Sequence, residues 1–495
     1  MKKRLFALFL AAAMTLGMSM SVFAAEEPTP GNYSITVGQI ANATTQHTYE
    51  AYQVFVGDLS KDGKLSNVTW GANVTGPVTF NGVEYKTAAD LAKGLEGADA
   101  AAFAQAVTLT GAPVATATET AVGSGVVFSG LQAGYYIVKD QEGSLTGEND
   151  SYSQYMVQVV GNVNVTAKAD VPSTTKKITD VNDSTGAVEA LQDSADYDIG
   201  DDIPFQFEST IVNNIANYKN AYVYTFHDKE SAGLTFNKDS VKMTVDGKDY
   251  TAFTVNTNTA DGCTFEIVTG DLKGVAKQGD KVVVTYTSKL NENAVVGAAG
   301  NPNEMYLEYS NNPNGAGTGK TPVDKVIAFT YKVVVEKVDE KQQPLAGAEF
   351  ALQKKVGEEW VTLELVKNTE GTVFTFTGLD DGEYQIMETA TPSGYNTISD
   401  KAIPFTVVAQ HDKDSADPKL TSLTGEVKSG LVGTYVFAPD KEAGALTSKI
   451  VNQSGAILPS TGGIGTTIFY IIGIVLVCGA GAILFVRKRM GNEEV

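Results

Sequence analysis

Short stretches of strict apolar and polar alternation recur through most of the 495-residue chain. Examples are Tyr33–Val37, Tyr222–Phe226, Lys281–Thr287 and Phe374–Thr377, and turns rich in Gly, Asn and Asp separate such stretches at short spacing. Because successive side chains point to opposite faces of a strand, the alternation fits sheets with one buried face and one solvated face. The pattern therefore predicts an all-β chain of tandem immunoglobulin-like sandwiches.

One segment departs from this pattern. Between Thr87 and Val107, the residues Leu91, Leu95 and Phe103 fall at helical spacing among alanines. Residues on one face of a helix recur in this way, so we expect one helix to decorate the first domain.

Two linker signals divide the strand-rich region. The first is Asp170–Thr175, and the second is the Asn-, Gly- and Pro-rich stretch 311–322. Such clusters form loops between segments of regular structure, so the sequence predicts domains at 25–168, 169–330 and 331–455.

Both ends of the chain carry targeting signals. Lys2, Lys3 and Arg4 precede an apolar run that ends in small residues, which predicts a signal peptide over 1–24 cut near Ala24. The uncharged run 464–486 is long enough for a roughly 30 Å hydrocarbon layer, and a basic tail follows it. We expect a transmembrane helix there and an exported region before it.

The composition excludes several functions. With 58 acidic and 37 basic side chains, the net charge is -21, which argues against a nucleic-acid partner. Cys478 lies in the second apolar run, so the exported region holds one cysteine, Cys263, which we expect to be a free buried thiol. The three histidines lack hydrolase or zinc spacing, and we expect no cofactor, no metal and no enzyme activity on an external substrate.

A pentapeptide stands before the second apolar run, formed by Leu458, Pro459, Ser460, Thr461 and Gly462. Together with the apolar span and the basic tail, it resembles the LPxTG cell-wall sorting signal of Gram-positive surface proteins. The resemblance implies that a sortase attacks the Thr461 carbonyl, releases Gly462 onward and transfers the acyl group to an amine. If the amine belongs to a peptidoglycan precursor, the product is a wall-anchored monomer; if it is a lysine of another copy, the chain polymerises. An ordinary single-pass anchor is the alternative.

The third predicted domain carries a further motif. Its segments Tyr331–Asp339, Gly382–Tyr395 and Lys449–Asn452 resemble the collagen-adhesin B-type (Cna-B-like) domain, including the E-box glutamate of that family. The resemblance implies an internal isopeptide bond between Lys337 and Asn452, assisted by Glu388.

Alternation supports this assignment, because it places Lys337 on the face of Val333 and Val335, which a sandwich buries. Burial lowers the pKa of a lysine and raises that of a carboxylic acid, which favours a neutral amine and a protonated acid. A buried Lys–Glu ion pair with a structural asparagine is the alternative.

The second domain resembles the middle domain of sortase-assembled major pilins. The resemblance rests on the segments 172–178, 197–205, 224–236 and 307–313. Lys176 shares a strand face with Ile178, and Asn311 shares one with Leu307 and Tyr309. We therefore expect a Lys176–Asn311 bond assisted by Asp228. Lys177 and Asn312 are the alternative reactants, and a surface charge or a turn former is the alternative role for each of these residues.

The first domain has no lysine in its opening strand, Tyr33–Ile40, so we expect no internal bond there. Segments 47–55 and 65–71 resemble the N-terminal domain of the same pilins. In that family a lysine at the end of this domain attacks the sortase-bound threonine of the next subunit, and Lys168 is the matching position. Thr166 and Ala167 replace the aromatic residue and the proline of the family motif, which leaves another lysine, or no polymerisation, as alternatives.

The sequence thus predicts the shaft subunit of a covalent Gram-positive pilus on the cell surface, anchored to the wall. The implied partners are pilin-type and housekeeping sortases, other copies of the chain, minor pilins, peptidoglycan precursor and a host glycoprotein or matrix. The alternative is a wall-anchored adhesin or minor pilin that binds a host ligand.

Overall fold

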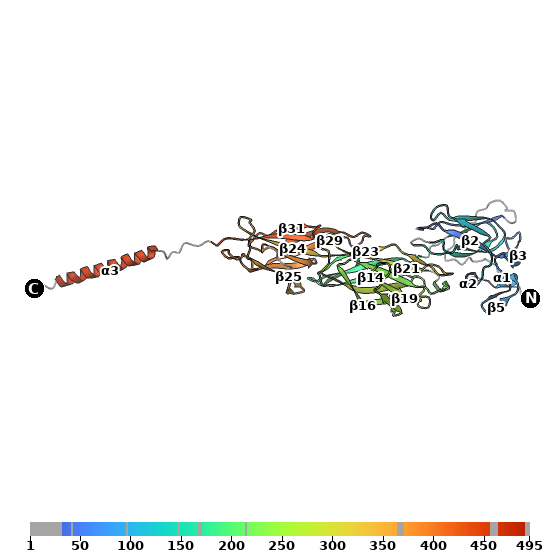
Figure 1. Cartoon of the computed structure of the whole chain (residues 1–495), viewed down its shortest axis with the longest axis horizontal. Helices are drawn as coiled ribbons and strands as arrows, with labels where there is room; N and C mark the ends of the chain where they lie inside the picture. The colour runs from blue at the N-terminus through green and yellow to red at the C-terminus, as the bar shows by residue number, and fades with distance from the viewer. Residues whose placement is uncertain are drawn as a thin grey trace, which may run out of the picture.

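The computed structural model describes residues 32–490, apart from 41–42, 96–97, 146–148, 167–170, 213–214, 364–370 and 456–463. Strands dominate it, and they gather in three bodies that follow one another in chain order along the long axis (Figure 1). The expected all-β class is confirmed. The predicted signal peptide, 1–24, lies outside the described residues.

The first body contains two main sheets. One has the strand order β10-β1-β7, the other has the order β3-β2-β8-β9 with β6 paired to β2, and β4 and β5 form a hairpin. The strands are β1 (Tyr33–Val37), β2 (Thr48–Leu59), β3 (Leu65–Trp70), β4 (Val78–Phe80), β5 (Val83–Tyr85), β6 (Ala115–Thr118), β7 (Val126–Leu131), β8 (Gly134–Asp140), β9 (Gln154–Val159) and β10 (Val163–Val165).

Where one helix was expected, the first body has two, α1 (Ala88–Gly94) and α2 (Ala98–Ala106). The Thr87 side chain caps α1 by accepting a hydrogen bond from the Asp90 amide. Leu95 adopts an extended backbone conformation, with φ -85° and ψ 97°, and this ends α1. Leu91 and Phe103 are buried in one core cluster, so the predicted apolar face is correct although the helix is broken.

The second body is a sandwich of two sheets. The six-stranded sheet has the order β12-β11-β14-β20-β16-β17, and the seven-stranded sheet has the order β13-β23-β21-β15-β19-β18 with β22 paired to β21. The elements are β11 (Thr174–Asn182), β12 (Ala187–Gln192), β13 (Ser194–Asp196), β14 (Asp202–Thr210), the short 3-10 helix η1 (Ile215–Asn217), β15 (Tyr224–Glu230), β16 (Leu234–Val245), β17 (Lys248–Asp249), β18 (Phe253–Asn256), β19 (Phe265–Thr269), β20 (Lys281–Leu290), β21 (Asn301–Ser310), β22 (Thr318–Lys320) and β23 (Asp324–Phe329).

The third body is built from one nine-stranded sheet with the order β26-β25-β28-β29-β30-β31-β32-β24-β27. Buried residues from both halves of that order, such as Leu352 and Phe376, share one core cluster. The strands are β24 (Tyr331–Asp339), β25 (Glu349–Val356), β26 (Glu359–Leu363), β27 (Val373–Leu379), β28 (Gly382–Ala390), β29 (Ile403–His411), β30 (Leu420–Val427), β31 (Phe437–Asp440) and β32 (Ala445–Asn452). The first strand, β24, pairs in parallel with the last, β32.

A single helix, α3 (Ile464–Met490), follows the third body along the chain. Among the residues that the structure describes, no helix is long and apolar enough to cross a membrane.

Candidate functional site

The interior of the second body contains a buried lysine and a buried aspartate that face each other. Lys176 lies on β11 of the six-stranded sheet, Asp228 lies on β15 of the seven-stranded sheet, and both are fully buried. The Lys176 Nζ donates hydrogen bonds to Asp228 Oδ2 and, at 3.0 Å, to the hydroxyl of Tyr286 on β20. That hydroxyl in turn donates to Asp228 Oδ2 at 3.0 Å. The structure thus brings together Lys176 and Asp228, as the sequence predicted.

Burial shifts both groups toward their neutral forms. Loss of water lowers the pKa of Lys176 and raises the pKa of Asp228, and the attraction between the two only partly offsets this. The walls around the amine are aromatic, with the ring centres of Phe207 and Phe205 at 4.8 and 5.3 Å from Nζ. The site therefore favours an uncharged amine beside a protonated carboxylic acid.

The carboxamide at this site belongs to Asn303 on β21. Its Nδ2 donates to the Tyr286 hydroxyl at 3.0 Å, so this amide and the Lys176 amine share one hydrogen-bond partner. Asn303 is fully buried, and its side chain is one of the groups that lower the pKa of Asp228 against the effect of burial. Its Oδ1 has no hydrogen-bond partner within the described part of the chain, which leaves the carbonyl free to be polarised.

Asn311, the predicted reactant, lies elsewhere. Its side-chain Nδ2 donates at 3.3 Å to the backbone carbonyl of Asp150 in the first body, and its backbone carbonyl accepts from the Tyr152 amide at 2.9 Å. The Tyr309 hydroxyl donates to the same Asp150 carbonyl at 3.1 Å. Asn311 therefore helps join the first body to the second, and the structure does not bring it to Lys176.

The physical reason is the position along the strand. Every second residue of β21 from Asn301 to Tyr309 is buried, so alternation marks the right face without choosing a residue on it. From Asn303 to Asn311 is roughly 26 Å at about 3.3 Å per residue. Only the pairing of β21 with β15 decides which residue lies opposite the lysine.

The two alternative reactants have other partners. Lys177 is half-buried, and its Nζ donates to Asp193 Oδ1 at 2.5 Å. Asn312 accepts from the Asn314 amide at 3.0 Å and donates to the Ala316 carbonyl at 3.3 Å, as a turn former does.

The third body holds a second lysine and asparagine. Lys337 on β24 and Asn452 on β32 are both buried. The parallel register pairs Lys337 with Ile450 and Asp339 with Asn452, so the two side chains are diagonal neighbours on one face. The Lys337 Nζ donates to the carbonyls of Val338 and Ile450 at 2.9 and 3.1 Å.

Glu388 on β28 orients the asparagine. Its Oε1 accepts from Asn452 Nδ2 at 2.8 Å, and its Oε2 accepts from the Ile398 amide at 3.2 Å. Asn452 Oδ1 has no partner among the described residues. Burial lowers the pKa of Lys337, although the Glu388 carboxylate opposes that shift. The structure thus brings Asn452 into direct contact with Glu388 and sets Lys337 diagonally beside Asn452, with the amide oxygen unengaged.

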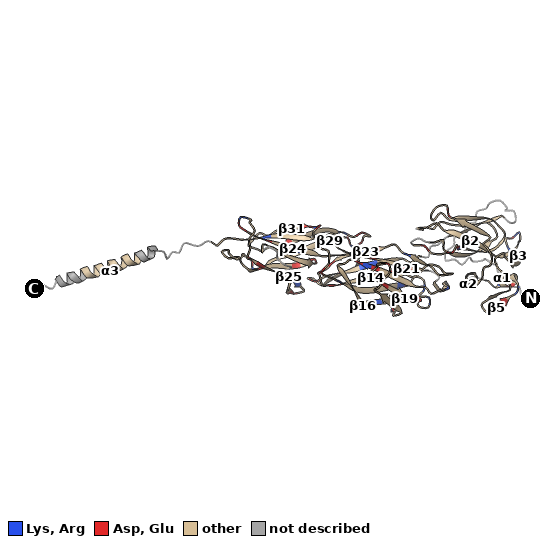
Figure 2. Ribbon diagram, in the orientation of Figure 1, with Lys and Arg blue, Asp and Glu red and all other residues tan. Residues whose placement is uncertain are grey.

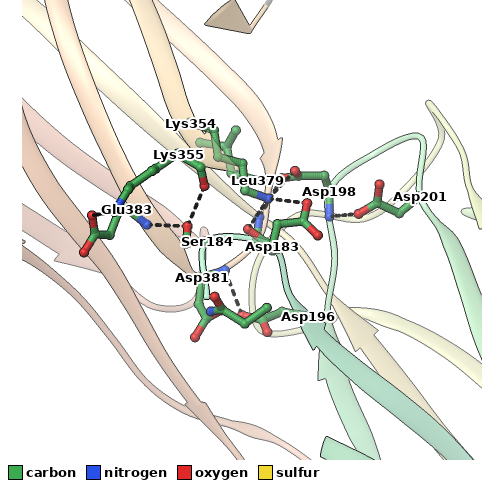
Figure 3. A network of polar contacts seen from close by, with 12 residues as sticks. Asp183, Ser184, Asp196, Asp198, Asp201, Lys354, Lys355, Leu379, Asp381 and Glu383 are labelled. Carbon is green, nitrogen blue, oxygen red and sulfur yellow. Dashed lines mark hydrogen bonds and ion pairs between the residues drawn. The ribbon is translucent and has the colours of Figure 1, made fainter. Parts of the chain in front are cut away.

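A third buried lysine, Lys354 on β25, anchors the second body to the third (Figure 3). Its Nζ contacts Asp380 at 2.7 Å in its own domain, and Asp183 at 3.0 Å and Asp198 in the neighbouring one. Burial opposes the charge, yet Asp380 and Asp198 raise the pKa of Lys354 above its ordinary value. Unlike Lys176, this lysine remains a cation, and it serves as an ionic anchor between two domains.

The residues predicted for linkage between subunits lie outside the described residues. These are Lys168 and the sorting pentapeptide of Leu458, Pro459, Ser460, Thr461 and Gly462.

Comparison with known proteins places these features in context. Residues 331–419 match the family model of the SpaA prealbumin-like fold domain, a match that includes Lys337 and Glu388. The chain is 28% identical over 420 residues to the trypsin-resistant surface T6 protein of Streptococcus pyogenes serotype M6, and the alignment covers 70% of this chain and 74% of that protein.

Two solved structures align with most of the chain. The T6 backbone pilin of serotype M6 Streptococcus pyogenes, a modular three-domain structure, has a TM-score of 0.53 at 17% identity and covers 86% of this chain and 99% of its own. The full-length major pilin SpaD of Corynebacterium diphtheriae has a TM-score of 0.47 at 18% identity and covers 86% and 98%. The likeness to the T6 backbone pilin supports the fold of tandem β domains described above.

Proposed function

We propose that this chain is the shaft subunit of a covalent surface pilus and that its sandwiches are stabilised by internal isopeptide bonds. The observation that carries the proposal is the repeated cluster of a buried lysine, a carboxylic acid and an asparagine, found once in each of two consecutive domains. The relation to the T6 protein and the fold shared with the T6 backbone pilin agree with it. Figure 2 shows Asp and Glu positions in all three bodies of the chain.

In the second domain, the bond joins Lys176 to Asn303. The neutral amine attacks the side-chain carbonyl carbon of Asn303, while protonated Asp228 polarises the carbonyl and passes protons to the leaving nitrogen. A new C–N bond forms, the bond from the carbonyl carbon to the amide nitrogen breaks, and one ammonia molecule leaves. Folding holds the reactants together, and this high effective concentration makes the exchange feasible.

In the third domain, the same chemistry joins Lys337 to Asn452, with Glu388 as the assisting acid. The hydrogen bond from Asn452 Nδ2 to Glu388 Oε1 at 2.8 Å positions the leaving nitrogen beside its proton donor. Because β24 and β32 are the first and last strands of the domain, the bond carries a pulling force from end to end through covalent links.

Polymerisation uses the sorting motif at the C-terminal end of one copy and the lysine at the end of the first domain of the next copy. A pilin-type sortase cleaves after Thr461 and joins its carbonyl to Lys168 of the next copy, and a housekeeping sortase transfers the finished fibre to peptidoglycan precursor. Minor pilins and a host glycoprotein or matrix are further partners of such a fibre.

A denaturing gel of cell-wall extract tests this function. Wild type should give a ladder of high-molecular-weight species, and Lys168→Ala should collapse it to monomer. Lys177→Ala is the matched control and should leave the ladder unchanged, because Lys177 is engaged with Asp193. A ladder that persists in Lys168→Ala contradicts the assigned linkage, and a wild type without a ladder favours the wall-anchored adhesin.

A further inference from the structure

A second polar cluster lies on the opposite face of β15 from the buried lysine site. His227 stands on that strand between two cross-strand neighbours, Glu266 of β19 and Tyr306 of β21. The turn before β19 brings Asp261 and Cys263 to the same place. Cys263 is only half-buried, which corrects the expectation of a fully buried thiol.

Three potential metal-binding atoms, one each from His227, Asp261 and Cys263, converge in this cluster, and Glu266 lies beside the histidine. The His227 Nδ1 lies 2.9 Å from Asp261 Oδ2 and 3.6 Å from Glu266 Oε1. The Cys263 Sγ lies 3.3 Å from Asp261 Oδ2. The other ring nitrogen, His227 Nε2, has no hydrogen-bond partner in the described part of the chain, so the polar environment of the ring lies on its Nδ1 side.

The Cys263–Asp261 separation matches that around one tetrahedral ion, and the hydrogen-bonded His227–Asp261 pair, at 2.9 Å, has to open by about 0.4 Å to admit one. With zinc bonds of about 2.0 Å to nitrogen and oxygen and about 2.3 Å to sulfur, tetrahedral ligand atoms stand roughly 3.3–3.7 Å apart. We propose that His227, Asp261 and Cys263 form a binding site for a single zinc ion on the second domain, with the fourth coordination position open to water.

The ligand chemistry selects the metal. A thiolate and an imidazole favour zinc over the hard cations calcium and magnesium, which prefer sites made only of oxygen. Sequence spacing could not reveal the site, because His227 comes from one strand while the other two ligands lie in the turn before the strand that pairs with it. Only the register of β15 with β19 brings them together.

The groups around the cluster hold the ligands in place. The Tyr306 hydroxyl donates to Asp261 Oδ2 at 2.8 Å, and its ring stacks on His227 with centres 4.5 Å apart. The Cys263 amide donates to Asp261 Oδ1 at 3.0 Å and fixes the carboxylate from the other side. Such partners of the ligands orient a metal site and tune its affinity.

Metal binding requires two proton movements. The Cys263 thiol releases its proton to solvent as sulfur binds zinc, and the ring proton of His227 leaves Nδ1 for Nε2. The bound ion ties the turn before β19 to β15, and it shields the single cysteine of the exported region from oxidation.

Cobalt titration of the full-length chain in detergent tests the site. Co²⁺ bound to a thiolate gives a sulfur-to-metal charge-transfer band in the near ultraviolet, and one equivalent should saturate it in wild type. Added Zn²⁺ should abolish the band by displacing cobalt. A folded wild-type chain that shows no band, or a band that Zn²⁺ leaves intact, overturns the proposal.

Variants distinguish this site from other thiols. Cys263→Ser should lose the band, whereas Cys478→Ser, which removes the other cysteine, should retain it. Tyr306→Phe keeps the stacked ring but loses the hydroxyl, and it should weaken cobalt binding by roughly 10-fold. As a readout of folding, Zn²⁺ should raise the melting temperature of wild type and not that of Cys263→Ser. An equal rise in both, or a band that follows Cys478, contradicts the assignment.

Discussion

Lys176 and Asp228 lie on opposite sheets of the second domain and meet between them through a direct hydrogen bond, shielded from solvent. Neither strand alone could create this environment, because each contributes only one of the two groups. The pair therefore marks the place where the two sheets can be joined covalently, and the Asn303 amide completes it.

The first prediction concerns the identity of the reacting asparagine. Asn303→Ala should abolish the bond to Lys176, whereas Asn311→Ala should leave it intact, because Asn311 contacts the first domain instead. By intact-protein mass, the Asn303→Ala variant should have lost one ammonia molecule fewer than wild type. A digest of wild type should contain a peptide that links Lys176 to Asn303. A peptide that links Lys176 to Asn311 would show instead that Asn311, the asparagine predicted from sequence, is the reactant.

The second prediction is that the two bonds form independently. Asp228→Ala should prevent only the bond in the second domain, and Glu388→Ala only the bond in the third, because each acid contacts a single cluster. Each loss opens a closed loop of roughly a hundred residues and should lower the free energy of unfolding by about 4–5 kcal/mol. Mass spectrometry and thermal unfolding measure the two effects. A variant that retains the full mass deficit would show that its acid is dispensable.

The third prediction concerns the anchor between the second and third domains. Lys354→Met leaves Asp198 and Asp380 buried without their cation and should destabilise the protein by roughly 3–5 kcal/mol. The adjacent Lys355 is half-buried and lies 3.6 Å from Glu383, so Lys355→Met should cost about 1 kcal/mol or less. Calorimetry of the two variants gives the comparison, and equal melting temperatures would contradict the anchoring role.

The fourth prediction is a pH dependence at the same junction. Burial, with repulsion from neighbouring carboxylates, raises the pKa of Asp180 and of Asp201 from 3.8 to about 6. Between the unfolded-state pKa of 3.8 and the folded-state pKa of about 6, these carboxyls bind more protons in the folded chain than in the unfolded chain. The free energy of unfolding therefore falls as the pH rises through this interval. Below this interval the stabilisation from the two protonated carboxyls is fully present, and above it that stabilisation is lost.

Thermal unfolding across this pH range measures the effect. The Asp180→Asn variant removes one of the titrating groups and should show a shallower decline with pH than wild type. A decline of the same steepness in both would mean that other groups control the transition.

Much of the fold can be read from local patterns. Alternation identified the β class, and it placed Lys176 and Lys337 on buried faces, because side-chain direction depends only on position within the strand. The apolar face of Thr87–Val107 was also correct, but the break at Leu95 depends on a backbone conformation that apolar spacing does not encode.

The two asparagines show the limit of this reasoning. Asn452 could be identified from the sequence because its proposed partners, Lys337 and Glu388, lie in segments that resemble a family motif. The parallel pairing of β24 with β32 then sets Asn452 diagonally to Lys337. Asn303 carried no such motif, and it shares its buried face with Asn311.

The sequence by itself determined the all-β class, the buried faces that carry Lys176 and Lys337, and which lysines and acids could react. Only the tertiary structure decided that Asn303, rather than Asn311, meets Lys176 and Asp228, and that Lys354 stays charged between two domains. The reason is that the face of a strand follows from its own residues, whereas the register between strands follows from the packing of the whole domain.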